Sequence, residues 1–223
     1  MNFSKLLIKK GRKKIMKRLI FIIAACVFVV VPARADLWNT GVDDSGVALP
    51  YDTADPHYTL TSVPSGPSTA KAIAPHSAWV TPPTDARWIA PTSSSTNDQV
   101  GWYIFETTFN LVDTIGVVVS GKWATDNSGE IWLNGSNTGI VRAHGVAGNF
   151  KNLVDFEITS DDFIVGDNTL EFKIYNGGVL PDINYGGPMG LLVTDMQVVP
   201  VPSAVLLGIL GLSAAGIKLR KFA

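Results

Sequence analysis

The second half of the chain alternates between apolar and polar residues with a period of two. The clearest case is the segment 102–110, in which every second residue belongs to one apolar face: Tyr103, Phe105, Thr107 and Phe109. Successive side chains of a β-strand point to opposite sides, so this pattern predicts a strand with one buried face. The same alternation, or a β-branched run, predicts further strands at 115–123, 130–133, 154–159, 169–175 and 189–199.

The first part of the body, residues 36–101, is rich in Pro, Ser, Thr and Ala. This composition is also typical of a disordered linker. Aromatic and apolar residues interrupt it at intervals, however, and they favour short strands joined by ordered loops. The expected strands cover residues 57–62, 79–80 and 87–89, and residues 92–98 are expected to form a polar loop.

Clusters of Gly, Asn and Asp separate the predicted strands. They lie at residues 126–129, 134–135, 165–168 and 176–178, where they supply residues that tolerate positive φ or cap their own backbone. Roughly eight to ten short strands at this spacing, without an amphipathic helix, predict an all-β fold, an antiparallel β-sandwich.

The amino-terminal segment has the layout of a secretory signal peptide. Eight cations precede the 13-residue apolar run Leu19–Val31, and an A-x-A cleavage site follows at Ala33, Arg34 and Ala35. Residues 1–35 are therefore expected to engage the Sec translocon and signal peptidase, with cleavage leaving Asp36 as the new N-terminus. Met16 is an alternative start, and an uncleaved membrane anchor is the alternative to removal.

The carboxy-terminal segment, residues 199–223, predicts a single membrane span with a basic tail. Its uncharged run Ala204–Ile217 has 14 residues, so as a helix it would be roughly 21 Å long against a hydrocarbon core of roughly 30 Å. Snorkelling cations must complete such a span. Three follow the run and place this end in the cytoplasm by the positive-inside rule: Lys218, Arg220 and Lys221. A buried core helix is the alternative.

At this end the chain resembles the PEP-CTERM sorting signals of Gram-negative envelope and biofilm proteins. The resemblance rests on a proline-punctuated entry, an apolar helix with a Gly-Leu element and a basic tail; the entry comprises Val199, Pro200, Val201, Pro202 and Ser203. It departs from the family pattern at Val201, where the family usually has Glu. The resemblance implies processing by an exosortase, a membrane transpeptidase-like enzyme, and an address in the cell envelope, at the cell surface or in the extracellular matrix.

Once both ends are set aside, the charge of the body is strongly negative. Of the 18 Lys and Arg residues, 12 lie in the terminal segments, so residues 36–198 hold six cations against all 19 carboxylates, a formal charge of −13. Such a domain repels nucleic acid, which is excluded as a partner. The single cysteine, Cys26, lies in the signal segment, so the exported domain has no disulfide and its stability must come from burial.

The body also resembles galactose-binding-like jelly rolls over residues 101–198. The resemblance rests on an Asp-Asn turn at Asp126 and Asn127, a strand that ends in Leu-Asn-Gly at residues 133–135, and a Gly-x-Asn-x-Leu turn at residues 166–170. It implies a jelly-roll sandwich and raises the expectation of a structural Ca²⁺. The carboxylate pairs at 43–44 and 161–162 are candidate ligands, although neither has the spacing of a complete Ca²⁺ loop.

The sequence shows no convincing catalytic set. The three imidazoles, His57, His76 and His144, are far apart in unlike contexts, and no G-x-S-x-G motif is present. Carbohydrate binding by a non-enzymatic module is the favoured interpretation, because sugar sites combine aromatic platforms with polar side chains. The candidates are Trp79, Trp88, Asp126, Asn127, Trp132 and Arg142. Trp132 could instead pack against a sheet, and Asp126 and Asn127 could stabilise their own turn.

The alternative to a binding module is a surface glycoside hydrolase that uses carboxylates at the sandwich edge. Its candidate carboxylates would be Glu106, Glu130 and Glu157, which alternate with apolar neighbours and are expected to point to solvent.

Overall fold

Two antiparallel β-sheets pack face to face in the computed structural model, which describes residues 37–66, 68–93, 98–144, 148–177 and 186–199. These residues form ten strands and no helix, which confirms the all-β prediction. The predicted signal segment, the predicted membrane span and all but the first residue of the sorting signal lie outside the described residues. Within the described ranges, no helix is long and apolar enough to cross a membrane.

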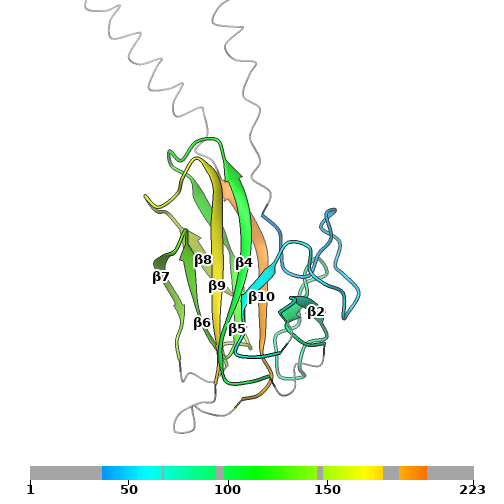
Figure 1. Cartoon of the computed structure of the whole chain (residues 1–223). Helices are drawn as coiled ribbons and strands as arrows, with labels where there is room; N and C mark the ends of the chain where they lie inside the picture. The colour runs from blue at the N-terminus through cyan, green and yellow to red at the C-terminus, as the bar shows by residue number, and fades with distance from the viewer. Residues whose placement is uncertain (1–36, 67, 94–97, 145–147, 178–185, 200–223) are drawn as a thin grey trace, which may run out of the picture. The chain divides into compact units, whose positions relative to one another are not determined.

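The first sheet has the strand order β1-β4-β9-β6-β7. Its strands are β1 (Thr59–Ser62), β4 (Gly101–Leu111), β9 (Gly166–Asn176), β6 (Ser128–Leu133) and β7 (Ser136–Arg142). The two longest, β4 and β9, pair along their whole length from Gly101↔Asn176 to Leu111↔Gly166. They form the long spine of this sheet in Figure 1.

The second sheet has the strand order β2-β3-β10-β5-β8. Its strands are β2 (Lys71–Ile73), β3 (Trp88–Ala90), β10 (Gly190–Val199), β5 (Val118–Asp126) and β8 (Val154–Ile158). Strands adjacent in a sheet are mostly distant in the sequence, so each sheet is assembled by connections that cross between the two layers.

The core lies between the sheets and is built from the residues that alternation had placed inward. Ile131, Leu133, Leu170, Phe172 and Ile174 are all fully buried. Phe172 joins the layers, because its ring centroid lies 6.0 Å from that of Trp123 and 6.0 Å from that of Phe156, both in the second sheet. Packing between the layers, rather than any single strand, therefore buries the apolar faces.

The predicted strand at residues 79–80 is wrong. Trp79 lies at the end of a turn, in which its own backbone N–H donates to the carbonyl of His76. The backbone N–H of Val80 donates to the carbonyl of Phe150. The sequence interpretation also missed β2 and β7. Strand β7 is an edge strand with no fully buried residue, so no apolar alternation marks it, and it is held by backbone pairing with β6.

Asn134 and Gly135, which the sequence marked as a turn, form the two-residue connection between β6 and β7. Both residues have positive φ, 49° for Asn134 and 81° for Gly135, as tight hairpin turns require. The side chain of Asn134 adds a hydrogen bond from Thr169 N to its Oδ1, which ties the hairpin to β9. The turn therefore sets the register of the β6–β7 edge of the sheet.

Candidate functional site

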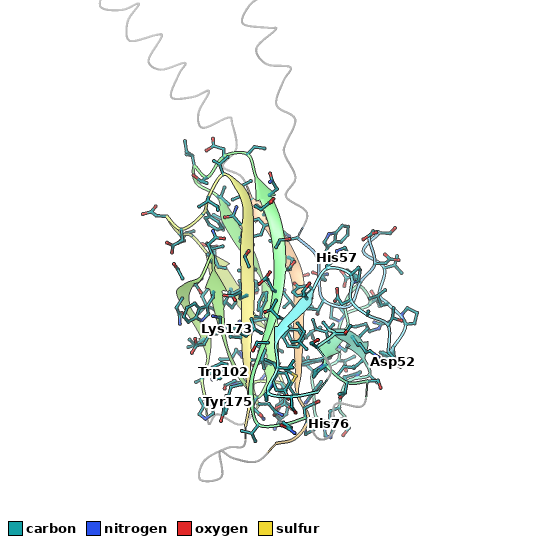
Figure 2. The ribbon with its side chains drawn as sticks, in the orientation of Figure 1. Asp52, His57, His76, Trp102, Lys173 and Tyr175 are labelled. Atoms are coloured by element: carbon teal, nitrogen blue, oxygen red, sulfur yellow. The ribbon has the colours of Figure 1, made fainter. Side chains whose placement is uncertain are left out.

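An aromatic pair, the exposed Trp102 and the half-buried Tyr175, marks the outer face of the first sheet near the start of β4 and the end of β9. Trp102 is directly opposite Tyr175 in the β4–β9 register, so both side chains point to the same side. Their ring centroids are 5.2 Å apart with an angle of 61° between the ring planes. Trp102 is 45% exposed, so a large apolar ring is available at the surface. Figure 2 shows the two side chains together, below Lys173 on the same sheet.

His144 extends this pair into a cluster of three rings. Its ring lies 4.9 Å from that of Tyr175, in an edge-on arrangement at 72°. Its Nδ1 lies 3.1 Å from the hydroxyl oxygen of Ser128, which is opposite Tyr175 on β6. The cluster thus combines apolar ring surface with the hydrogen-bonding groups of Ser128 on β6 and of His144 just after β7.

These residues line an open pocket of about 380 Å³. Its remaining walls come from the start of β6, the end of β7 and the residue after β7, namely Gly129, Glu130, Val141, Arg142 and Ala143. A pocket of this size is within the range that small ligands occupy. It offers aromatic surface, an imidazole and a carboxylate, groups that can pack on a sugar ring and hydrogen-bond to its hydroxyls.

Arg142 is the only predicted sugar-binding residue that lines this pocket among the described residues. Its Nη2 donates to the carbonyl of Asn149 at 2.7 Å and to that of Asn152 at 3.2 Å. Burial lowers the pKa of this guanidinium from its usual value. The side chain braces the loop beside the pocket, so its main observed role is to hold the wall in place.

Trp132 lies on the same face but its ring is occupied by a neighbour. The Nζ of Lys173 lies 3.6 Å from the centroid of the Trp132 ring, a close cation–π contact, and 3.4 Å from a carboxylate oxygen of Glu171. The Trp132 Nε1 donates to Glu130 at 2.9 Å. The half-buried ring therefore packs on the sheet, which is the alternative that its alternation with Ile131 and Leu133 had left open.

Trp79, Trp88 and Asp126 lie in the interior rather than on a binding surface. Trp79 and Trp88 are 6% and 0% exposed, and their ring centroids are 4.3 Å apart. Neither can serve as an exposed sugar platform in this fold, so these two assignments are corrected. Trp79 lies in the loop before β3 and Trp88 is the first residue of β3, and both rings lie against Gly190 of β10.

Asp126 and Asn127 stabilise the connection between β5 and β6. The Nε1 of Trp79 donates to Asp126 Oδ2 at 2.8 Å, and the Nδ2 of Asn127 donates to Asp126 Oδ1 at 2.6 Å. Asn127 Oδ1 accepts from Gly177 N at 3.0 Å. Burial raises the pKa of Asp126 to about 7, and the Trp79 hydrogen bond opposes this shift. Asp126 and Asn127 therefore hold the β5–β6 connection together, as the alternative to sugar binding had suggested.

The described residues that line this pocket do not include the pair of carboxylates that a glycoside hydrolase uses. Ser128 and His144 are within hydrogen-bonding distance, but Ser128 is only 4% exposed and no described carboxylate forms an ion pair with His144. Glu130 is the one carboxylate among the lining residues, and its Oε2 accepts from both Trp132 and Asn137. Glycoside hydrolysis in its usual form requires two carboxyl groups flanking the bond.

The carboxylates gather instead on the outer face of the second sheet. Asp155, Glu157 and Asp195 line an open hollow of about 460 Å³ together with Lys122, whose Nζ lies 2.9 Å from Asp195. Phe156 contributes the one aromatic ring among the residues lining the hollow, and it is 4% exposed. This face therefore has charge without an exposed ring on which a sugar could stack.

No group of three or more His, Cys, Asp or Glu side chains in the described ranges could hold a metal ion. Asp43 accepts from Ser45 N and Val47 N, and these hydrogen bonds lower its pKa. Asp162 accepts from the Ser160 hydroxyl. His57 stacks on Trp38, His76 lies beside Trp79, and His144 lines the pocket, so the three imidazoles are in separate surroundings. Binding of Ca²⁺ stays a prediction.

Sequence reasoning missed the pocket residues Trp102, Tyr175, Ser128 and His144. One signal was present, because Trp102 falls on the outward side of its alternating segment, where a large aromatic ring is unusual. The partner Tyr175 is 73 positions away and is identified only through the β4–β9 register.

Comparisons with known proteins identify no family. No protein-family model matches the chain, and no curated protein matches it. Among solved structures, it is similar to a CBM35 from Paenibacillus barcinonensis, with 14% identity and a TM-score of 0.32 over 66% of this chain and 95% of that one. It is similar to a family 35 carbohydrate-binding module from an environmental isolate, with 9% identity and a TM-score of 0.30 over 77% and 94% of the two chains.

The chain is also similar to part of a β-glucosidase from Kluyveromyces marxianus, with 9% identity and a TM-score of 0.32. That alignment covers 76% of this chain and 20% of the β-glucosidase. TM-scores this low do not establish a common fold, so the function of the pocket is argued from its own geometry.

Proposed function

We propose that this chain is an exported, non-enzymatic envelope or extracellular-matrix protein whose β-sandwich binds carbohydrate in the Trp102–Tyr175 pocket. The observation that carries the proposal is the aromatic pair with its exposed Trp102, which borders a pocket that also supplies Glu130 and His144. A pyranose has one apolar face and a rim of hydroxyl groups. Trp102 can stack on the face while the polar side chains exchange hydrogen bonds with the rim.

The acidic character of the domain also supports a neutral glycan as the ligand. With a formal charge of −13 over residues 36–198, the surface disfavours nucleic acid and strongly anionic polymers. A neutral sugar pays no such electrostatic penalty. We propose further that the two sheets form a galactose-binding-like jelly roll, and that Ca²⁺ adds to its stability.

The address of the protein is proposed from its two ends. Residues 1–35 are proposed to direct export through the Sec translocon, with removal by signal peptidase. Residues 199–223 are proposed to anchor the chain once in the membrane until an exosortase-like enzyme processes it. Replacing Pro200 and Pro202 by Ala and following the mass of the mature protein tests this step. Unchanged trimming would count against the sorting signal.

Carbohydrate binding is tested with the full chain in a mild detergent on a glycan array, with and without Ca²⁺. Trp102→Ala should weaken binding to any glycan that the parent chain retains by at least about fivefold, since an aromatic contact contributes about 1 kcal/mol beyond its area. The matched control is Tyr51→Ala, because Tyr51 is a 55% exposed aromatic residue outside the pocket. Equal effects of the two substitutions, or no retained glycan, would refute the assignment.

The alternative function is a surface glycoside hydrolase that uses Asp155 and Glu157 on the edge strand β8, together with Asp195. What favours this alternative is that three carboxylates line one hollow. Release of reducing sugar from a bound glycan, abolished by Glu157→Gln and retained in Trp102→Ala, would support the enzyme over the binding module.

A further inference from the structure

Four large aliphatic side chains are exposed together at one end of the sandwich. Val112 and Ile115 in the β4–β5 loop are 69% and 72% exposed, and Ile164 and Val165 in the β8–β9 loop are 51% and 66% exposed. The last residue of β4, Leu111, pairs with the first residue of β9, Gly166, so the two loops leave the sheet side by side. We call these four residues the apolar tip. Large aliphatic side chains exposed on two adjacent loops are a candidate interaction site.

The loops of the apolar tip are held by buried polar side chains. Asn168, which is fully buried, accepts from Ile164 N and donates to the carbonyls of Ile164 and Gly166. Asn134 braces the same loop, since its Nδ2 donates to Asn168 Oδ1 and to the Asp162 carbonyl. In the other loop, Asp113 Oδ1 accepts from Ile115 N at 3.0 Å. The aliphatic side chains are thus presented to solvent on fixed loops.

The described chain ends at this same end of the sandwich. Val199, the last described residue, is 44% exposed and pairs with Val118, three residues after Ile115. Four residues then separate Val199 from the apolar run that begins at Ala204. A chain spans at most about 3.5 Å per residue, so Ala204 is within roughly 18 Å of Val199. A bilayer that holds the proposed membrane segment is therefore within reach of the apolar tip.

The charge around the apolar tip selects the kind of membrane surface. The two loops, residues 112–117 and 159–165, contain the carboxylates Asp113, Asp161 and Asp162 and no Lys or Arg. Anionic headgroups attract basic segments and repel carboxylates. A surface of zwitterionic phospholipid has the apolar boundary that the four aliphatic side chains fit, without that repulsion.

The carbohydrate pocket lies toward the opposite end of the same strands. Trp102 is nine residues before Leu111 on β4, which at about 3.4 Å per residue is roughly 30 Å. The labelled Trp102 and Tyr175 in Figure 2 lie low on β4 and β9, far from the β4–β5 and β8–β9 loops at the other end of these strands.

We propose that the apolar tip rests in the headgroup region of a zwitterionic bilayer and orients the sandwich so that the Trp102–Tyr175 pocket faces away from the membrane. This inference relies on the proposed membrane segment at residues 204–217. The tethered domain then stands upright, and a polysaccharide beyond the membrane surface meets the pocket first.

The test uses the full chain with Cys26→Ser and one new cysteine, reconstituted in phosphatidylcholine vesicles that contain doxyl-labelled lipid. A fluorophore at Val165→Cys or Ile115→Cys should lose at least half of its emission to the doxyl group. The matched probe is Val141→Cys, because Val141 is a 56% exposed aliphatic residue beside the pocket and should stay unquenched. Adding Ile164→Asp to the Val165→Cys chain should reduce the quenching, whereas adding Val154→Asp should not.

The possible outcomes separate this inference from the proposed membrane anchor. Chain that floats with the vesicles but is unquenched at Val165 and Ile115 overturns the orientation and leaves the anchor intact. Equal quenching at Val141 means that the sandwich lies flat, which also overturns it. Chain that does not float with the vesicles overturns both. If the fluorophore at Val165 or Ile115 loses its emission equally in vesicles without doxyl lipid, the loss comes from contact between labelled copies. That result assigns the apolar tip to a second copy of the chain instead.

Discussion

The carboxyl group of Asp126 should make the stability of this domain fall as the pH rises. Asp126 is 4% exposed, and burial raises its pKa to about 7 in the folded state against a reference value of 3.8. Because the folded-state pKa is the higher one, the folded protein holds a proton that the unfolded chain has already released between these two values. The contribution to stability is therefore complete below about pH 4 and is lost as the pH rises to about 7.

The magnitude follows from the size of this shift. Each pKa unit corresponds to about 1.4 kcal/mol, so the change between pH 4.5 and pH 8 is about 3 kcal/mol. The substitution Asp126→Asn keeps the shape and removes the titration. The free energy of unfolding of the parent chain minus that of the variant should fall by this amount across the range.

Urea unfolding of the full chain in a non-ionic detergent, followed by near-ultraviolet circular dichroism of the buried tryptophans, measures this difference. Asp43→Asn is the control, because backbone hydrogen bonds from Val47 and Ser45 lower the pKa of Asp43 and place its titration below this range. A parent-minus-variant difference that stays constant, or grows with pH, would refute the reasoning. It would mean that the hydrogen bonds from Trp79 and Asn127 stabilise the carboxylate more than burial destabilises it.

Two further substitutions test the packing. Phe172→Ala should lower the free energy of unfolding by about 3–5 kcal/mol, because a fully buried ring between the sheets leaves a cavity; a loss below about 1 kcal/mol in urea unfolding would contradict its place in the core. Asn168→Ala should cost about 1–3 kcal/mol through unpaired backbone groups at Ile164 and Gly166, and amide hydrogen exchange should accelerate at Ile164. Unchanged exchange there would show that Asn168 does not hold the loop.

Several aspects of the fold were accessible from local pattern. The alternation in 102–110 identified β4 and its buried face, and the Asn134-Gly135 pair identified the β6–β7 turn. These features are readable because strand periodicity and turn conformation depend on residues that are close in the sequence. The charge separation between the ends and the acidic body is likewise a property of sequence alone.

The candidate site was decided by tertiary structure. Local pattern shows that Trp102 points outward, but only the β4–β9 register brings Tyr175 beside it, and only the β6–β9 register adds Ser128. In the same way, Trp79 and Trp88 resemble surface platforms in a Pro-rich segment until that segment joins the second sheet as β2 and β3 and both rings are buried.

The sequence by itself determined that this protein is an acidic β-rich body between two apolar, basic ends, because composition and short-range periodicity carry that information. Only the tertiary structure decided which outward residues meet in a pocket, which aromatic rings are buried, and that the pocket and the apolar tip lie toward opposite ends of β4 and β9. Those outcomes depend on pairing and layer packing between strands far apart in the chain, which no local pattern encodes.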